Sequence, residues 1–285
     1  MKGNSPIIIT GMHRSGTTLV SKIIEDNNVF LGISKDINNE SIFFQNINKW
    51  LMSINSSTWD NPHSFLDTVH TQNFKLNLDK LKLTLNGKLN FRYFGFKNYF
   101  SNNNFYSIKY NWGWKDPRNI FTLPFWMKLF PQSKVIIIIR HPIDVINSLL
   151  IREKKNINID KNNFKRIYPY FLITLFNLNN FSNRSSMMLN SFDDGMNLCM
   201  KYFDEIKKIE KQYKKNVIIV KYEDIVKNKV DSINKILNFC RIREIDQNNK
   251  LLETIKEDRV YNFNLRKQEY KKYKTIIEKC GYINM

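Results

Sequence analysis

The chain has 285 residues, of which 42% are hydrophobic and 14% aromatic, and its formal net charge is +19 at pH 7. A chain of this length buries roughly 75% of its unfolded surface, so it can form a hydrophobic core without disulfide bonds or metal ions. This excludes the class of small proteins that depend on disulfide bonds for stability. Its cysteines (Cys199, Cys240 and Cys280) are widely spaced and form no CxxC pair, which is typical of free thiols in a reducing compartment.

Apolar β-rich runs alternate with helical patterns along the chain. This alternation predicts an α/β fold with a central parallel sheet and helices on both faces. In chain order we expect a strand at 6–10, helices at 17–25 and 41–54, an irregular stretch at 58–104 with a strand near 91–96, a helix at 119–130, a strand at 134–140, helices at 143–152 and 193–215, a strand at 217–221, and helices at 230–240 and 266–279. No repeat or Pro/Gly/Ser-rich linker is seen, so residues 1–285 are predicted to form a single domain, with an insertion at about 41–110.

The apolar segments indicate a cytoplasmic protein. The N-terminus enters a predicted strand almost at once, so we expect no secretory signal. The most apolar stretch, residues 135–151, contains Arg140, His141 and Asp144, and we therefore expect no membrane span.

The high positive charge has two interpretations. A basic surface attracts polyanions such as nucleic acid or acidic glycans. The chain is also rich in Asn, Lys and Ile, the residues that an AT-rich coding sequence over-supplies. We favour the compositional origin and predict no nucleic-acid partner, because no RNA-binding or zinc-finger signature accompanies the charge.

A glycine-bracketed loop follows the first predicted strand. Gly11 and Gly16 have the spacing of a phosphate-binding P-loop, but Thr17 stands where nucleoside triphosphatases carry lysine. Backbone N–H groups of such a turn and of the following helix form an anion site. Thr18 adds a second hydroxyl, and Arg14 adds a guanidinium inside the loop. The loop therefore predicts an anion other than a triphosphate.

A second motif begins where the strand at 134–140 ends. Arg140 closes that strand, and Ser148 follows eight residues later in a predicted helix. Ligands bind at the carboxyl ends of parallel strands, and an arginine with a hydroxyl is suited to hold a second phosphate. Taken alone, the pair would be interpreted as an arginine capping the sheet edge and a buried serine.

Together these motifs resemble the sulfotransferases that use 3′-phosphoadenosine 5′-phosphosulfate (PAPS). The resemblance continues in residues 112–118 (WGWKDPR) and 220–224 (VKYED). It is closer to the tyrosylprotein and bacterial branches, because Arg14 stands where the small-molecule cytosolic enzymes have lysine. It implies a three-layer, P-loop-like fold and transfer of a sulfuryl group from PAPS to a hydroxyl of a glycan, a peptide tyrosine or a small alcohol.

The resemblance also assigns roles to residues of this chain. It implies that Arg140 and Ser148 bind the 3′-phosphate and that Tyr222 approaches the adenine, although packing at a strand end is the alternative for Tyr222. It implies charge stabilisation in the transition state by Arg14 and Lys115, with no metal. The 5′-phosphosulfate is expected to bind the loop residues His13, Arg14, Ser15, Gly16, Thr17 and Thr18.

The acceptor hydroxyl needs a base, and Glu40 is the first candidate. The alternative for Glu40 is a carboxylate favoured by the dipole of the helix that begins beside it. His63 is the second candidate base. Asp116 and Arg118 are interpreted as a local ion pair that orients its loop, with no part in the chemistry.

Two other function classes stay open at this point. One is a P-loop kinase or other NTPase, and the other is a protein that binds nucleotides or polyanions without turnover. The acceptor is expected to be bound largely by residues 41–110, and the basic surface mildly favours an anionic acceptor.

Overall fold

A four-stranded parallel sheet lies at the centre of the computed structural model, which describes residues 3–62, 71–96, 104–167 (159–167 by their backbone alone), 186, 188–246, 249, 252–253, 255 and 266–282. The strand order is β2-β1-β3-β4, and all three pairings are parallel. The strands are β1 (Ile7–Gly11), β2 (Gly113–Lys115), β3 (Lys134–Ile139) and β4 (Val217–Lys221).

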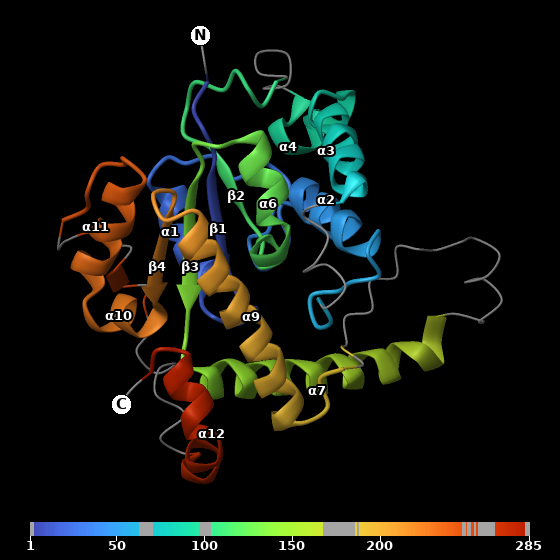
Figure 1. The fold of residues 1–285 in the computed structure, drawn as a ribbon, viewed down its shortest axis with the longest axis vertical. Helices are drawn as coiled ribbons and strands as arrows, with labels where there is room; N and C mark the ends of the chain where they lie inside the picture. Colours follow the sequence, from blue (N-terminus) through green and yellow to red (C-terminus); the bar gives the residue numbers. More distant parts are fainter. Residues whose placement is uncertain are drawn as a thin grey trace.

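Helices surround this sheet, as Figure 1 shows. Most of them agree with the sequence prediction to within a few residues, although α7 is longer than predicted and α10 was not predicted. Their bounds are α1 (Thr17–Asp26), α2 (Ile42–Ser53), α3 (Gln72–Leu85), the short 3₁₀ helix η2 (Lys88–Asn90), α4 (Phe91–Phe94), α6 (Asn119–Leu129), α7 (Pro142–Ile167), α9 (Phe192–Gln212), α10 (Tyr222–Lys227), α11 (Lys229–Phe239) and α12 (Lys267–Lys279).

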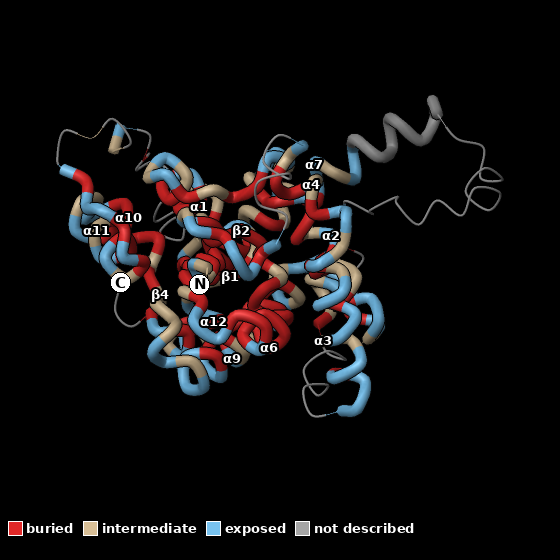
Figure 2. The backbone as a smooth tube through the Cα atoms, turned by 90° about the horizontal axis from the view of Figure 1, so that it is seen from above, coloured by how far each residue is buried: buried red, intermediate tan, exposed pale blue. Residues whose placement is uncertain are grey.

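The sheet separates two hydrophobic cores, which explains why its strands are continuously apolar rather than alternating. Ile8 and Ile137 face a core that includes residues of α2, α6 and α9. Ile9, Ile136 and Ile138 face a second core, which includes residues of α1, α10 and α11. Figure 2 shows buried positions concentrated on β1 and on α6. The predicted three-layer α/β architecture is therefore confirmed.

The prediction for residues 91–96 is wrong. Their aromatic composition favours a strand, but the chain forms α4 there, directly after η2. Tertiary contacts explain the outcome, since Tyr93 is fully buried and its hydroxyl donates to the carbonyl oxygens of Phe30 (3.0 Å) and Gly113 (2.7 Å). The stretch predicted to be irregular also contains the helix α3.

The helix α7 places the second motif against the first. Pro142 opens this helix directly after β3, at a position where proline is well tolerated. In Figure 1, α7 crosses the end of the sheet toward which β3 points. The loop after β1 and the first turns of α7 thus share the carboxyl edge of the sheet, where ligands bind in such folds.

Two observations bear on the expectations drawn from composition. Cys199, Cys240 and Cys280 are buried free thiols, as predicted. Within the described ranges, no helix combines the length and the apolar character that a bilayer crossing requires.

Candidate functional site

The loop between β1 and α1 has a backbone that needs glycine at both ends. Gly11 has a φ of 148° and Gly16 a φ of 101°, and Arg14 between them is also left-handed with a φ of 72°. A Cβ atom at Gly11 would lie 2.3 Å from the carbonyl oxygen of Ile138, and one at Gly16 would lie 2.2 Å from the Tyr222 ring. Both positions therefore require glycine. The turn that they form leads directly into the N-terminus of α1, and a loop of this kind before a helix N-terminus is the geometry of an anion site.

Two polar atoms of this loop are buried without a hydrogen-bond partner in the described part of the chain. They are the Ser15 hydroxyl and the Nε2 atom of His13. A buried polar group without a partner costs free energy, so such atoms suit a ligand that supplies the missing bonds. Thr17 is also buried, and Thr18 donates its hydroxyl to the backbone oxygen of Asn38 at 3.1 Å.

The pKa of His13 is affected by its burial and by the positive charges near the loop. Its ring lies edge-on to Trp59, with 4.7 Å between centroids. Burial lowers the pKa of His13 well below its usual value, and the positive charges of Arg118, Arg152, Lys115 and Arg14 lower it further. The imidazole is therefore neutral at pH 7, and four cations surround the loop on which an anion would bind.

The two sequence motifs meet in space. The Nε atom of Arg14, in the loop, donates to the Ser148 hydroxyl of α7 at 2.9 Å. The Arg140 guanidinium lies over the Tyr222 ring, 4.9 Å from its centroid. The same ring packs so closely on Gly16 that it leaves no room for a Cβ atom there. The structure thus brings together the residues predicted for the two phosphates at the carboxyl ends of β1, β3 and β4.

The turn after β3 is held by a buried carboxylate. Glu223, in α10, accepts hydrogen bonds from the backbone N–H of His141 at 2.8 Å and from the Tyr282 hydroxyl at 3.0 Å. The Arg140 side chain is further linked to Asp144, one turn along α7, at 3.3 Å. These contacts fix the strand end from which Arg140 projects.

Glu40 lies between two cations at the other side of the loop. Its carboxylate is 3.0 Å from Lys115 Nζ and 3.3 Å from Arg118 Nη1, and Gln45 Nε2 donates to it at 2.8 Å. Lys115 and Glu40 are almost completely buried, with 2% and 4% of their side chains exposed. Lys115 also donates to the Asn38 oxygen at 3.1 Å, the same atom that Thr18 contacts. Lys115, predicted to stabilise charge, and Glu40, the candidate base, are therefore joined to the loop through Asn38.

The pKa of Glu40 results from opposing effects. Burial raises it, but the charges of Lys115 and Arg118 and the hydrogen bonds from Gln45 and Lys115 bring it below its usual value. Glu40 is consequently a carboxylate at neutral pH. Asp116 differs, because burial and the charge of Glu40 raise its pKa more than Arg118 and its hydrogen bonds lower it.

Sequence reasoning missed the contact of Arg118 with Glu40. The predicted ion pair between Arg118 and Asp116 is confirmed at 3.0 Å, but Arg118 also reaches Glu40 across 78 residues of sequence. The available signal was its position three residues after Lys115 in the same segment. His63, the second candidate base, lies outside the described residues.

The profile of a sulfotransferase family matches residues 6–246 of this sequence. The chain belongs to the sulfotransferase family. One similar solved structure is a sulfotransferase domain from the curacin biosynthetic pathway, with 17% identity and a TM-score of 0.46 over 90% of this chain and 80% of that chain. A second is a sulfotransferase from Alicyclobacillus acidocaldarius, with 10% identity and a TM-score of 0.48 over 98% of this chain and 94% of that chain. A third is mouse sulfotransferase SULT7A1 complexed with PAP, with 18% identity and a TM-score of 0.43 over 90% of this chain and 63% of that chain. No curated protein sequence matches it.

In this sulfotransferase the loop glycine Gly16 allows a direct test of the packing against Tyr222. Gly16→Ala is expected to lower the free energy of unfolding by about 1–2 kcal/mol through backbone strain and by about 1–3 kcal/mol more through the clash. Gly281→Ala is the matched control, since Gly281 has a φ of 83° but no atom within 4 Å of the place that a Cβ would occupy. Urea denaturation measures both, and equal losses would contradict the close approach of Tyr222.

The ion pairs of Glu40 predict an acid-sensitive fold for this sulfotransferase. Because the folded-state pKa of Glu40 lies below its usual value of 4.5, its contribution to stability is present above that pH and is lost as the pH falls through the lowered pKa. The free energy of unfolding, measured by urea denaturation between pH 7 and pH 3, should therefore fall less steeply in Glu40→Gln than in the wild type. Glu210→Gln, at an exposed position of α9, is the control and should retain the wild-type slope.

Proposed function

We propose that this sulfotransferase transfers a sulfuryl group from PAPS to the hydroxyl of an acceptor. The observation that carries the proposal is the junction of two cationic sites at one sheet edge. Arg14, in the glycine loop, donates a hydrogen bond to Ser148. Arg140 packs on the Tyr222 ring, which itself packs against Gly16 of the same loop. A nucleotide with phosphates on two different positions of its ribose fits such a pair of sites better than a linear triphosphate does.

The donor would bind along this edge. The backbone amides of the loop, with the hydroxyls of Ser15, Thr17 and Thr18, would hold the 5′-phosphosulfate. The unpartnered Ser15 hydroxyl supports this assignment, because a buried donor of that kind suits an anion. Arg140 and Ser148 would hold the 3′-phosphate, with Tyr222 beside the adenine. His13, which is neutral and has a buried Nε2 atom, would contribute a hydrogen bond rather than a charge.

The chemical step forms one bond and breaks another. The acceptor oxygen bonds to the donor sulfur, the bond from sulfur to the bridging phosphate oxygen breaks, and 3′-phosphoadenosine 5′-phosphate (PAP) leaves. Negative charge develops on the bridging oxygen, where Lys115 and Arg14 would stabilise it. The proton of the acceptor hydroxyl would pass to Glu40.

The ion pair of Glu40 with Lys115 implies that the donor binds before the acceptor proton is transferred to Glu40. While both cations hold it, Glu40 is a weak base, because its pKa is lowered. A donor that draws Lys115 toward the bridging oxygen would leave Glu40 with Arg118 and Gln45 only. Loss of one cation raises the pKa of a carboxylate, so Glu40 would become a stronger base once the donor is bound.

Isothermal titration calorimetry with PAP tests the donor assignment. AMP is the matched ligand, because it lacks only the 3′-phosphate, and ATP with magnesium represents the kinase and NTPase alternative. We expect PAP to bind at least roughly tenfold more tightly than AMP, the value of one charge-assisted hydrogen bond. Binding of ATP with magnesium that equals or exceeds that of PAP would overturn the proposal.

A further inference from the structure

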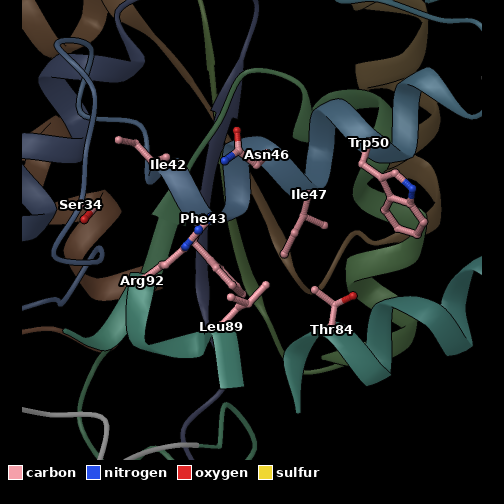
Figure 3. A pocket seen from close by; sticks show the side chains of 9 residues that line it. All are labelled: Ser34, Ile42, Phe43, Asn46, Ile47, Trp50, Thr84, Leu89 and Arg92. Atoms are coloured by element: carbon pink, nitrogen blue, oxygen red, sulfur yellow. The ribbon is translucent and has the colours of Figure 1, made fainter. Parts of the chain in front are cut away.

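A cavity of about 580 Å³ lies on the face of α2 that is turned toward α3, η2 and α4. This volume is in the range of sites for small organic ligands, roughly 300–1,000 Å³. Figure 3 shows the side chains that surround it. They are Ser34, Ile42, Phe43, Asn46, Ile47, Trp50, Thr84, Leu89 and Arg92.

The walls of the cavity are mainly apolar, with one cation. Phe43 and Ile47 form its buried side, while Leu89 is 52% exposed at its rim. Arg92 is its single charged side chain and makes no hydrogen bond or ion pair with any described residue. A cavity of this kind suits an apolar chain that ends in an anionic group.

The cavity has a polar end and an apolar end. In Figure 3, Ser34, Ile42 and Arg92 lie at one end, and Trp50 and Thr84 lie at the other. Ile42 and Trp50 are separated along α2 by about 12 Å, given a rise of 1.5 Å per residue. A bound amphiphile would thus place its anionic head beside Ile42 and its tail beside Trp50.

The polar end lies at the base of the loop that carries Glu40. The backbone N–H of Ile42 donates to the Ser34 oxygen at 3.0 Å, and Lys35 forms an antiparallel bridge with Ser41. Glu40 and Asn38 lie within this closed loop, and through them it contacts Lys115. The loop is therefore the piece of chain that the cavity shares with the proposed catalytic groups.

We infer that this cavity binds the apolar body of the acceptor and that the acceptor is an anionic amphiphile. Its anionic group pairs with Arg92, and its hydroxyl is carried next to that group, at the end nearest Glu40. The inference rests on the proposed function, since it identifies the substrate that receives the sulfuryl group in the step described above. An apolar chain fits these walls better than a glycan does, because most of the lining surface is apolar.

Binding is tested first, with dodecanoate below its micellar concentration as the probe. Trp50 lines the cavity, so its fluorescence should change on binding, and this change should disappear in Trp50→Phe. Arg92→Gln removes the cation and Thr84→Phe fills the apolar end. Each is expected to weaken dodecanoate roughly tenfold or more, the value of one charge-assisted hydrogen bond or of one blocked apolar contact.

Matched controls lie beside both positions. Lys88→Gln removes a neighbouring exposed cation that does not line the cavity, and Leu83→Phe adds an aromatic ring on α3, at a side chain that is 73% exposed. Both controls should bind dodecanoate within roughly twofold of the wild type. Equal losses in the controls, or no binding by the wild type, would overturn the inference.

Turnover with positional isomers tests the orientation. With PAPS as donor, 2-hydroxydodecanoate should yield a sulfate ester detectable by mass spectrometry, because its hydroxyl lies beside the carboxylate. The isomer 12-hydroxydodecanoate should bind but not react, since its hydroxyl is held near Trp50. Sulfation of the second isomer in preference to the first, or of neither while both bind, would overturn the inference.

The donor assignment and the acceptor inference fail separately. If PAP binds as expected but dodecanoate does not, the acceptor inference is wrong and the donor assignment stands. If PAP does not bind, the proposed function is wrong, whatever dodecanoate does. A detected sulfate ester of 2-hydroxydodecanoate that is lost in Thr84→Phe and retained in Leu83→Phe supports both.

Discussion

Replacement of Lys115 by alanine is expected to lower kcat by roughly 10²–10³-fold, the cost of removing one fixed donor from a developing negative charge. Lys115 is almost fully buried at the carboxyl end of β2 and is 3.0 Å from Glu40. In the proposed reaction its positive charge is needed most when the bridging oxygen departs. The KM for PAPS should therefore change less than roughly threefold, because the bridging oxygen of bound PAPS has not yet gained this charge.

A fold control accompanies this variant, since loss of one partner of a buried ion pair destabilises a protein. Glu40 keeps Arg118 and Gln45 in Lys115→Ala, so the variant is expected to fold and to bind PAP. Lys109→Ala, at an exposed lysine shortly before β2, should leave kcat unchanged. A rise in the KM for PAPS as large as the loss in kcat would show that Lys115 serves the fold or the ground state.

Arg140→Ala is expected to abolish recognition of the 3′-phosphate. The loss of charge-assisted hydrogen bonds from Arg140 should weaken PAP by roughly 10- to 150-fold, which corresponds to about 1.5–3 kcal/mol. AMP affinity should not change, because AMP has no phosphate at that position. Calorimetry on the wild type and the variant, with both nucleotides, gives the four values needed.

Arg243→Ala, at an exposed arginine beyond α11, controls for the general loss of positive charge and should leave both affinities unchanged. Equal weakening of PAP and AMP in Arg140→Ala would instead indicate that Arg140 mainly positions Tyr222. The guanidinium lies 4.9 Å from the centroid of that ring, so a purely structural role would affect both nucleotides alike.

The glycine loop and the Arg140 motif were predictable, because each lies within one short segment and is joined to a strongly apolar strand. Five isoleucines and valines in a row before Arg140 leave little choice but a buried strand. The rule that the carboxyl ends of parallel strands share one sheet edge placed both motifs at that edge, but the direct contact of Arg14 with Ser148 was not predicted.

Other features of the fold and site were beyond sequence reasoning for physical reasons. The strand β2 has only three residues and its sequence, Gly-Trp-Lys, has no apolar periodicity. The aromatic residues of α4 have high strand propensity, but the burial of Tyr93 against Phe30 and Gly113 overrides it. The contact of Arg118 with Glu40 depends on how two distant loops fold together, which no local pattern encodes.

The strand order has a consequence for biosynthesis. The first strand, β1, has no neighbour in the sheet until β2 is made, and Ile7 and its partner Gly113 are more than one hundred residues apart. At 5–20 residues per second, the ribosome takes roughly 5–20 s to supply that partner. During this interval the apolar N-terminal segment has unpaired edges on both sides, and such edges are prone to aggregation. We expect the nascent chain to depend on a chaperone between the synthesis of β1 and that of β3.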